Sequence, residues 1–201
     1  MPEQAFFLAN ITKCDKKEQL KKILAFNLSP VLQQVKPSEL IILKKKCFEK
    51  VWLAEKYGII KDLGLNCRTL HISHDSIYLL FYGESMLKRW LLDTHCQKSL
   101  KKNGYNNTLS MQSLFYQLRK RMQNNFPHEI GLFLGYPVND VEGFIRFSGK
   151  NFCACKYWKV YENPEYSLDK FRQIDIARNQ AAKLLNGSIS LNRAVKLIKT
   201  M

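Results

Sequence analysis

The sequence lacks several features that would restrict what the protein is. A helix that spans a membrane needs about 20 consecutive apolar residues, and no run of that length occurs. Only 9 glycines and 6 prolines are present among 201 residues, and no repeat or low-complexity segment interrupts the chain. Aromatic residues make up 12% of the sequence and charged residues 24%, which excludes wholesale disorder. A chain of this length is expected to build its own core without a metal or a disulfide.

An export signal is not expected either. The first ten residues are apolar, but no basic segment precedes them, and Lys13, Asp15 and Lys16 follow at once, so a secretory leader is not predicted. The six cysteines are spread along the chain, at Cys14, Cys47, Cys67, Cys96, Cys153 and Cys155. We therefore expect free thiols in a cytoplasmic protein.

Acidic residues are scarce relative to basic ones, which gives a formal net charge of +15. No acid occurs between Asp93 and Glu129, or after Asp175. The candidate anion-binding residues of the first stretch are Lys98, Lys101, Lys102, Arg119, Lys120 and Arg121, and the second holds Arg178, Lys183, Arg193, Lys196 and Lys199. The positive electrostatic field of these residues favours nucleic acid, a phosphorylated ligand or an acidic protein as partner. The alternative is a solvated basic face, because no nucleic-acid-binding motif accompanies the charge.

Five segments have the short apolar or alternating patterns of β-strands. They are residues 39–45, 67–72, 77–82, 128–135 and 155–161, and the second and third read as a hairpin. Helical spacing covers residues 15–26, 48–63, 84–100, 110–125, 165–185 and 190–199. A further helix is expected from Asn139, because Glu142 three residues later resembles a capping box. These elements predict an α/β fold, with α+β as the alternative: a single mixed sheet of about five strands flanked by helices.

The chain is expected to divide near residue 175. Residues 1–175 are predicted to form the α/β domain, and residues 176–201 a C-terminal helical extension that packs on it.

The densest group of reactive side chains lies where the fourth expected strand meets a helix. An imidazole titrates near neutrality, so His128 can act as a base with Glu129 as its orienting acid. Neighbours on a strand point to opposite faces, so the two share a pocket only if the strand begins irregularly. The catalytic candidates are His128, Glu129, Tyr136 and Asp140. The alternative is a surface histidine beside glycines that serve backbone packing.

The turn Gly135–Asp140 is expected to be a rigid platform. Pro137 fixes its own φ and restricts Tyr136 to extended geometry, and Gly135 allows a ligand to approach the backbone. Amide groups at a helix start suit an anion, so Gly135 and Asn139 are the candidate cofactor-binding residues. The cofactor itself is not identified, since no phosphate-loop or dinucleotide fingerprint is present. The rival interpretation is a tight, well-packed corner.

Two further groups have both a functional and an ordinary interpretation. Cys153 and Cys155 are two residues apart on an expected strand, so they share a face and can form a redox pair or half of a metal site. No second pair stands at ligand spacing, so no metal site is predicted and buried, inert thiols are favoured. The aromatic residues of Tyr157–Tyr161, with Lys156 and Lys159, can stack bases or can simply belong to the core.

The sequence resembles a known bacterial family, the domain-of-unknown-function family 3793, over roughly residues 20–175. The segments that carry the resemblance are His128–Pro137, Asp140–Ile145, Gly149–Asn151, Trp158–Tyr161, Ser29–Leu32 with Lys36-Pro37, and the hairpin strand Tyr78–Tyr82. The resemblance implies a soluble bacterial protein but no catalytic role, because the family has no established activity. This chain has Leu28 where the family has a cysteine before its Ala-Pro-Thr-Leu segment, which argues against thiol catalysis by that residue.

Two functions follow as expectations. The first is a small-molecule enzyme with its site at the strand–turn–helix junction of residues 128–140. The second is a non-enzymatic protein that binds an anionic partner, namely nucleic acid, a nucleotide or an acidic protein. The sequence does not decide whether the protein is an enzyme, and it says nothing of the oligomeric state.

Overall fold

The computed structural model describes residues 2–106, 110–187 and 189–201, and it divides the chain into two compact units. The first unit contains the residues up to Gly83 together with those from Gln173 onward, and the second contains Glu84–Arg172. Helix α10 (Pro164–Asn186) runs across the boundary between these residue sets. The predicted separation of an extension beginning at residue 176 stays a prediction.

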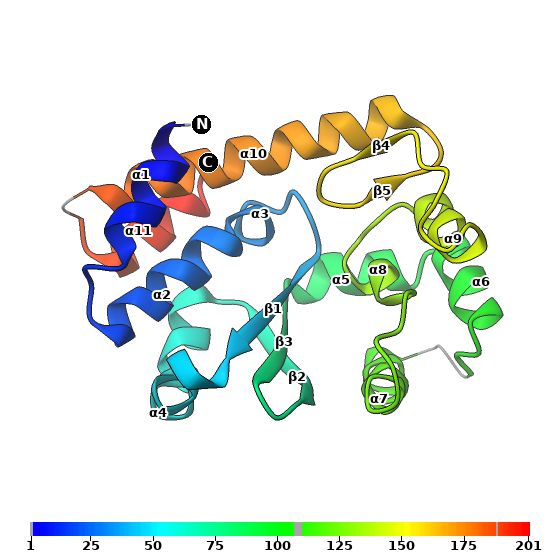
Figure 1. Cartoon of the computed structure of the whole chain (residues 1–201), viewed down its shortest axis with the longest axis horizontal. Coiled ribbons are helices and arrows are strands. Elements are labelled where there is room, and N and C mark those ends of the chain that lie inside the picture. Colours follow the sequence, from blue (N-terminus) through cyan, green and yellow to red (C-terminus); the bar gives the residue numbers. More distant parts are fainter. Residues whose placement is uncertain (1, 107–109, 188) are drawn as a thin grey trace. The chain divides into compact units, whose positions relative to one another are not determined.

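The first unit is built around a three-stranded sheet (Figure 1). Its elements are α1 (Pro2–Ile11), α2 (Lys16–Asn27), α3 (Ser29–Leu32), β1 (Ser38–Lys44), α4 (Lys45–Leu63), β2 (Asn66–Ile72), β3 (Ser76–Tyr82), the later part of α10 and α11 (Leu191–Ile198). The strand order is β1-β3-β2, and both pairings are antiparallel. The strands predicted at 39–45, 67–72 and 77–82, and the hairpin, are thus confirmed.

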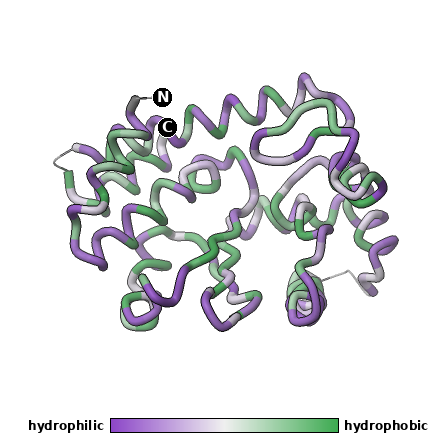
Figure 2. The backbone as a smooth tube through the Cα atoms, viewed as in Figure 1, coloured by the Kyte–Doolittle hydropathy of each residue, from purple (hydrophilic) through white to green (hydrophobic). Residues whose placement is uncertain are grey.

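Local signals in the sequence explain where the helices of this unit begin and end. The Asp15 carboxylate accepts hydrogen bonds from the backbone N–H groups of Lys17 and Glu18, so it caps α2. Gly64 ends α4 with φ +58°, a left-handed conformation that glycine adopts without a steric cost. Polar and apolar stretches alternate along α10 in Figure 2, as expected for an amphipathic helix.

The core of the first unit is apolar. Leu79 and Phe81 of β3 are fully buried, and the Phe81 ring meets the edge of Trp52 from α4 at a centroid distance of 6.0 Å. Leu24 of α2 and Ala181 of α10 belong to the same buried cluster. Burial of such side chains is the main contribution to stability here, at about 1.5–3 kcal/mol for each large one.

The second unit is mostly helical. Its elements are α5 (Glu84–Leu91), α6 (Thr94–Lys102), α7 (Met111–Arg121), α8 (Ile130–Phe133), α9 (Val138–Arg146), β4 (Ala154–Cys155), β5 (Lys159–Val160) and the first turns of α10. Strands β4 and β5 form a short antiparallel hairpin in which Cys155 pairs with Lys159. The α/β class is confirmed, but the expected single mixed sheet of about five strands is a three-stranded antiparallel sheet and a separate two-stranded one.

The strand predicted at residues 128–135 is wrong. The segment forms turns and the short helix α8, and Gly131, Leu132 and Phe133 are all buried. A continuous apolar run that is buried on every side has neither the period of a strand nor that of an amphipathic helix, so its sequence does not distinguish the two.

Three other expectations need correction. Residues 155–161 pair only at their ends, because a turn occupies the middle. The helix expected over 84–100 is interrupted, since Asp93 caps a new helix, α6, by accepting from the backbone of His95 and Cys96. Asn139 is not a helix cap: it lies inside α9, which begins after Pro137 without a side-chain cap.

No helix in the described ranges is long and apolar enough to cross a membrane.

Candidate ligand-binding site

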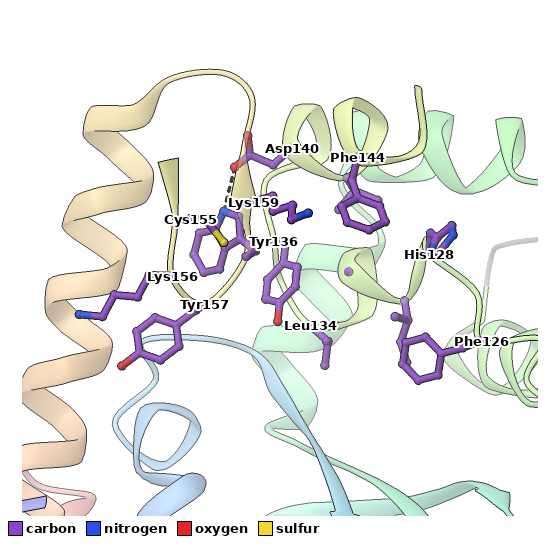
Figure 3. Close-up of a pocket in the computed structure, with 14 residues that line it drawn as sticks. Phe126, His128, Leu134, Tyr136, Asp140, Phe144, Cys155, Lys156, Tyr157 and Lys159 are labelled. Carbon is purple, nitrogen blue, oxygen red and sulfur yellow. Dashed lines mark hydrogen bonds between the residues drawn. The ribbon is translucent and has the colours of Figure 1, made fainter. Parts of the chain in front are cut away.

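A cavity of about 430 Å³ lies in the second unit, between the α8–α9 corner and the β4–β5 hairpin (Figure 3). In this view Lys156 and Tyr157 stand on one side of it and His128 and Phe126 on the other. The lining residues are Phe126, His128, Ile130, Gly131, Leu134, Tyr136, Asp140, Val141, Phe144, Cys155, Lys156, Tyr157, Trp158 and Lys159. Three of the four predicted catalytic residues, His128, Tyr136 and Asp140, therefore share one cavity.

Aromatic rings form most of the wall. Tyr136 stacks on Trp158 with a centroid distance of 4.8 Å and an interplanar angle of 26°. The Trp158 and Phe171 rings also pack edge to face, with a centroid distance of 4.4 Å, so Phe171 helps to hold the indole in place. Near the opposite side of the cavity, the His128 and Phe144 rings lie edge to face at 5.1 Å. Each pair contributes roughly 1 kcal/mol beyond burial, so the wall is preformed.

The corner that presents Tyr136 is closed by two glycines. Gly135 has φ +75°, and the backbone N–H of Tyr136 donates to the carbonyl of Gly131 at 2.9 Å. A Cβ atom at Gly131 would lie 2.8 Å from a methyl of Val141 and 3.0 Å from the Tyr136 ring. Glycine is therefore needed at residue 131 to bring α8 and α9 together, and at residue 135 to turn the chain.

Asp140 is held by hydrogen bonds from four donors. Its Oδ1 accepts from the backbone N–H groups of Tyr161 and Glu162 at 2.7 and 3.2 Å. Its Oδ2 accepts from the indole of Trp158 at 2.8 Å, drawn as the dashed line in Figure 3, and from the hydroxyl of Ser167 at 3.1 Å. The residue is only 2% exposed. This carboxylate fixes the hairpin and the start of α10 against α9, and its acceptor positions are largely used.

Glu129 faces away from the cavity. It is buried, and one of its oxygens, Oε1, accepts from Arg121 Nε at 2.5 Å and from the Tyr105 hydroxyl at 3.2 Å. Burial and the neighbouring Glu129 carboxylate raise the pKa of Tyr105. Glu129 is absent from the cavity lining and His128 is present, so the predicted acid–base pair does not meet at this wall.

Two lysines of the hairpin bring positive charge to the cavity. Lys159 Nζ donates to the carbonyl of Gly149 at 2.6 Å and lies over the rings of Phe152 and Phe144, at 4.8 and 5.7 Å. Lys156 is exposed, and its Nζ lies 5.6 Å from the centroid of the Tyr157 ring. An ammonium over an aromatic face is stabilised by the ring quadrupole, so both charges are held near the aromatic wall.

The two neighbouring thiols are exposed, so the expectation that they are buried is wrong. Cys155 lines the cavity, while Cys153 donates its S–H to the carbonyl of Val160 at 3.2 Å. By contrast, Cys96 is buried and Cys67 partly buried, and this burial raises the pKa of each thiol to about 12. Among the residues that the structure describes, no three His, Cys, Asp or Glu side chains gather as a metal site.

The other predicted residues lie elsewhere. Asn139 lines a second cavity, and its amide donates to Glu162 at 2.6 Å; Gly135 lines neither cavity. Of the predicted anion-binding residues, Lys102 pairs with Glu142 at 3.2 Å and Arg121 with Glu129. Lys98, Lys101, Arg119 and Lys120 are exposed on α6 and α7.

Sequence reasoning missed Phe126, Phe144 and Phe171 as parts of the site. These three residues are far apart in the sequence, so the sequence does not show that they lie close together. The cavity forms only when α9 and the hairpin pack together. The one available signal was the run of aromatic and basic residues at 156–161, which was interpreted as either base-stacking or core.

The fold and the cavity define an α/β protein with a preformed aromatic site in its helical unit. Residues 24–195 match the family described as "Protein of unknown function (DUF3793)". The match covers most of the chain, so the protein belongs to this family. No curated protein and no solved structure matches it.

Proposed function

We propose that the second unit binds a planar heteroaromatic small molecule that carries negative charge, of the nucleotide or flavin class, in the cavity beside Tyr136. The observation that carries this proposal is the combination of a stacked aromatic wall with two lysines around one cavity of about 430 Å³. Small-molecule sites have volumes of roughly 300–1,000 Å³ and apolar walls with a few placed polar groups.

The charges around the cavity support an anionic ligand. The one carboxylate in its lining is Asp140, whose oxygens already accept hydrogen bonds from the protein. Lys156, Lys159 and His128 are the other ionisable side chains there apart from Tyr136, Tyr157 and the thiol of Cys155. A flat ring in contact with the Tyr136–Trp158 stack would leave its phosphate or carboxylate near the hairpin lysines.

Binding is better supported than acid–base catalysis. General catalysis needs an acid and a base within hydrogen-bond reach of the reacting atoms. Glu129 faces Arg121 and Tyr105, and Asp140 serves as a structural acceptor. His128 supplies the one imidazole among the described lining residues. An enzymatic role at this junction therefore stays the alternative.

Titration with matched ligand pairs tests the proposal. FMN and AMP should quench tryptophan fluorescence and raise the melting temperature, and the uncharged riboflavin and adenosine should bind more weakly because they lack the phosphate. Tyr136→Leu should weaken binding by tenfold or more, on the order of one lost stacking contact, while Tyr136→Phe should keep it. Absence of binding by all four compounds, with the protein folded by circular dichroism, would refute the proposal.

A charge variant gives a second control. Lys156→Gln should weaken AMP binding several-fold, since it removes an exposed ammonium from the cavity rim. Lys150→Gln, an exposed lysine outside the lining, should leave binding unchanged. Equal losses in both variants would mean that only the general positive field of the protein acts.

We also propose that the protein is cytoplasmic. All six cysteines are free thiols, and three of them, Cys47, Cys153 and Cys155, are exposed. Exposed thiols persist in a reducing compartment. Thiol labelling in intact cells under non-reducing conditions should find all six reduced; a disulfide there would contradict this location.

A further inference from the structure

A second cavity, of about 620 Å³, lies in the same unit and shares no lining residue with the first. Its lining residues come mainly from α5, the start of α9 and the start of α10 with the segment before it. Its apolar surface comes in part from Trp90 and Tyr166. The Trp90 indole donates to the carbonyl of Leu132 at 2.6 Å, so this wall is fixed.

Ionisable groups of both signs line this cavity. Arg89 lies on the same face of α5 as Trp90, and His95 follows at the start of α6. The side chains of Arg89 and His95 make no hydrogen bond or ion pair with any residue in the described parts of the chain. Their donor positions are open to a ligand.

The two acids differ from these cations. Asp93 caps α6: its Oδ1 accepts from the backbone of His95 at 2.9 Å and of Cys96 at 3.4 Å. Glu162 belongs to the segment before α10, and among the described residues only its Oε2 accepts a hydrogen bond, from Asn139 at 2.6 Å. The Glu162 carboxylate thus keeps an oxygen for a positively charged donor.

We propose that this cavity binds a small zwitterion of the amino-acid class with an apolar or aromatic side chain. Arg89, assisted by His95, binds the ligand's carboxylate. Glu162 accepts from its ammonium group, and the side chain packs against Trp90 and Tyr166. An anion alone would leave Glu162 without a positively charged partner, and a cation alone would leave Arg89 open, so a ligand with both charges matches the cavity best.

Three probes that differ by one group test this assignment: L-phenylalanine, L-phenylalaninamide without the carboxylate, and 3-phenylpropionate without the amine. Binding is followed by NMR through the indole N–H signal of Trp90, with that of Trp158 as the marker of the first cavity. Phenylalanine should shift the Trp90 signal at concentrations up to about 10 mM, the range for ligands of this size. Each truncated probe should bind roughly tenfold more weakly, as expected for one lost charge-assisted hydrogen bond.

Two variants assign the groups. In Arg89→Gln, phenylalanine should no longer bind more tightly than phenylalaninamide. In Glu162→Gln, phenylalanine should no longer bind more tightly than 3-phenylpropionate. Lys88 is a neighbouring exposed lysine outside the lining, so Lys88→Gln should leave both differences in affinity unchanged. Equal affinity of the three probes, no shift at Trp90, or a shift at Trp158 alone would overturn the proposal. These outcomes are independent of nucleotide binding, because the two cavities have different lining residues.

Discussion

The two units of the chain are held together in different ways. The first unit packs leucine and aromatic side chains from its sheet and helices into one apolar cluster. The second unit also buries apolar residues, but its corner depends on two buried carboxylates, Glu129 and Asp140, that accept hydrogen bonds from several segments. Apolar contacts are not directional, so an apolar core accepts hydrophobic substitutions that conserve its volume, whereas a buried carboxylate requires its donors in fixed positions.

This difference fits the two cavities described above, which are both lined by residues of the second unit. In the second unit, short helices and a hairpin are held apart by directional hydrogen bonds, and cavities remain between them. In the first unit, interdigitating apolar side chains fill such spaces. The Asp140 network positions the hairpin and α10 at a distance set by hydrogen-bond lengths, and the aromatic wall stands beside it. A preformed site with rigid walls is the consequence, since the polar network determines where the rings of Tyr136 and Trp158 lie.

The largest expected effect comes from Asp140→Ala. The substitution leaves four donors without their acceptor, at a cost of about 4 kcal/mol or more in the free energy of unfolding. Urea denaturation followed by tryptophan fluorescence measures the loss, and hydrogen exchange should place it within residues 84–172. Asp169→Ala removes an exposed acid of the same unit and should cost under about 1 kcal/mol. Similar losses in both variants would contradict the structural role of Asp140.

Leu79→Ala is the corresponding test of the first unit. Leu79 is fully buried in the central strand, so truncation should cost about 3 kcal/mol through lost burial and a cavity. Ile42→Ala on β1 is the control, because that side chain is 47% exposed and should cost well under half as much. Increased hydrogen exchange should be concentrated in the first unit; a change confined to residues 84–172 would be inconsistent with separate cores.

Two helical glycines sharpen the comparison further. A Cβ atom at Gly143 of α9 would lie within 2.4 Å of the Tyr161 ring, so Gly143→Ala should destabilise the protein by about 2 kcal/mol through overpacking. Gly58 of α4 has nothing within 4 Å of such an atom, and Gly58→Ala should stabilise by about 0.5–1 kcal/mol through helix propensity. The melting temperatures of the two variants test this prediction. A change in melting temperature of the same sign in both would contradict the packing at Gly143.

Alkaline pH should weaken both units, because each contains one cysteine whose pKa is raised by burial. Burial raises the pKa of Cys67 and of Cys96 from 9.0 to about 12. The unfolded chain releases these protons above pH 9 and the folded chain keeps them, so stability falls as pH rises from about 9 towards 12. At about pH 10 the loss is roughly 1 kcal/mol per thiol. Urea midpoints at several pH values under reducing conditions should show a smaller slope in Cys96→Ala, and an unchanged slope in the exposed control Cys47→Ala.

The smallest effect is expected from removal of a hydroxyl. Tyr161 Oη is buried without a hydrogen-bond partner in the described part of the chain, so Tyr161→Phe should leave stability unchanged or raise it by up to about 1 kcal/mol. Tyr105→Phe loses a hydrogen bond to Glu129 and should cost about 1 kcal/mol. Thermal melts of the two variants should therefore shift in different directions; a marked loss in Tyr161→Phe would reveal a partner for its hydroxyl.

The sequence by itself determined the first unit rather well. The strands at 38–44, 66–72 and 76–82 follow short β-type patterns, and α4 ends at Leu63, where the helical spacing of residues 48–63 predicted its end. Each of these features depends on residues close together in the chain, so local propensity and periodicity are sufficient to predict it.

Only the tertiary structure decided the character of residues 128–140 and the use of their side chains. Residues 129–134 are all buried, so their pattern carried no period that separates strand from helix. Whether Glu129 or His128 faces the cavity depends on Arg121 and Tyr105, which lie on other elements. The role of Asp140 depends on donors 18 to 27 residues further along the chain. Such contacts form when distant segments pack, and no local signal in the sequence records them.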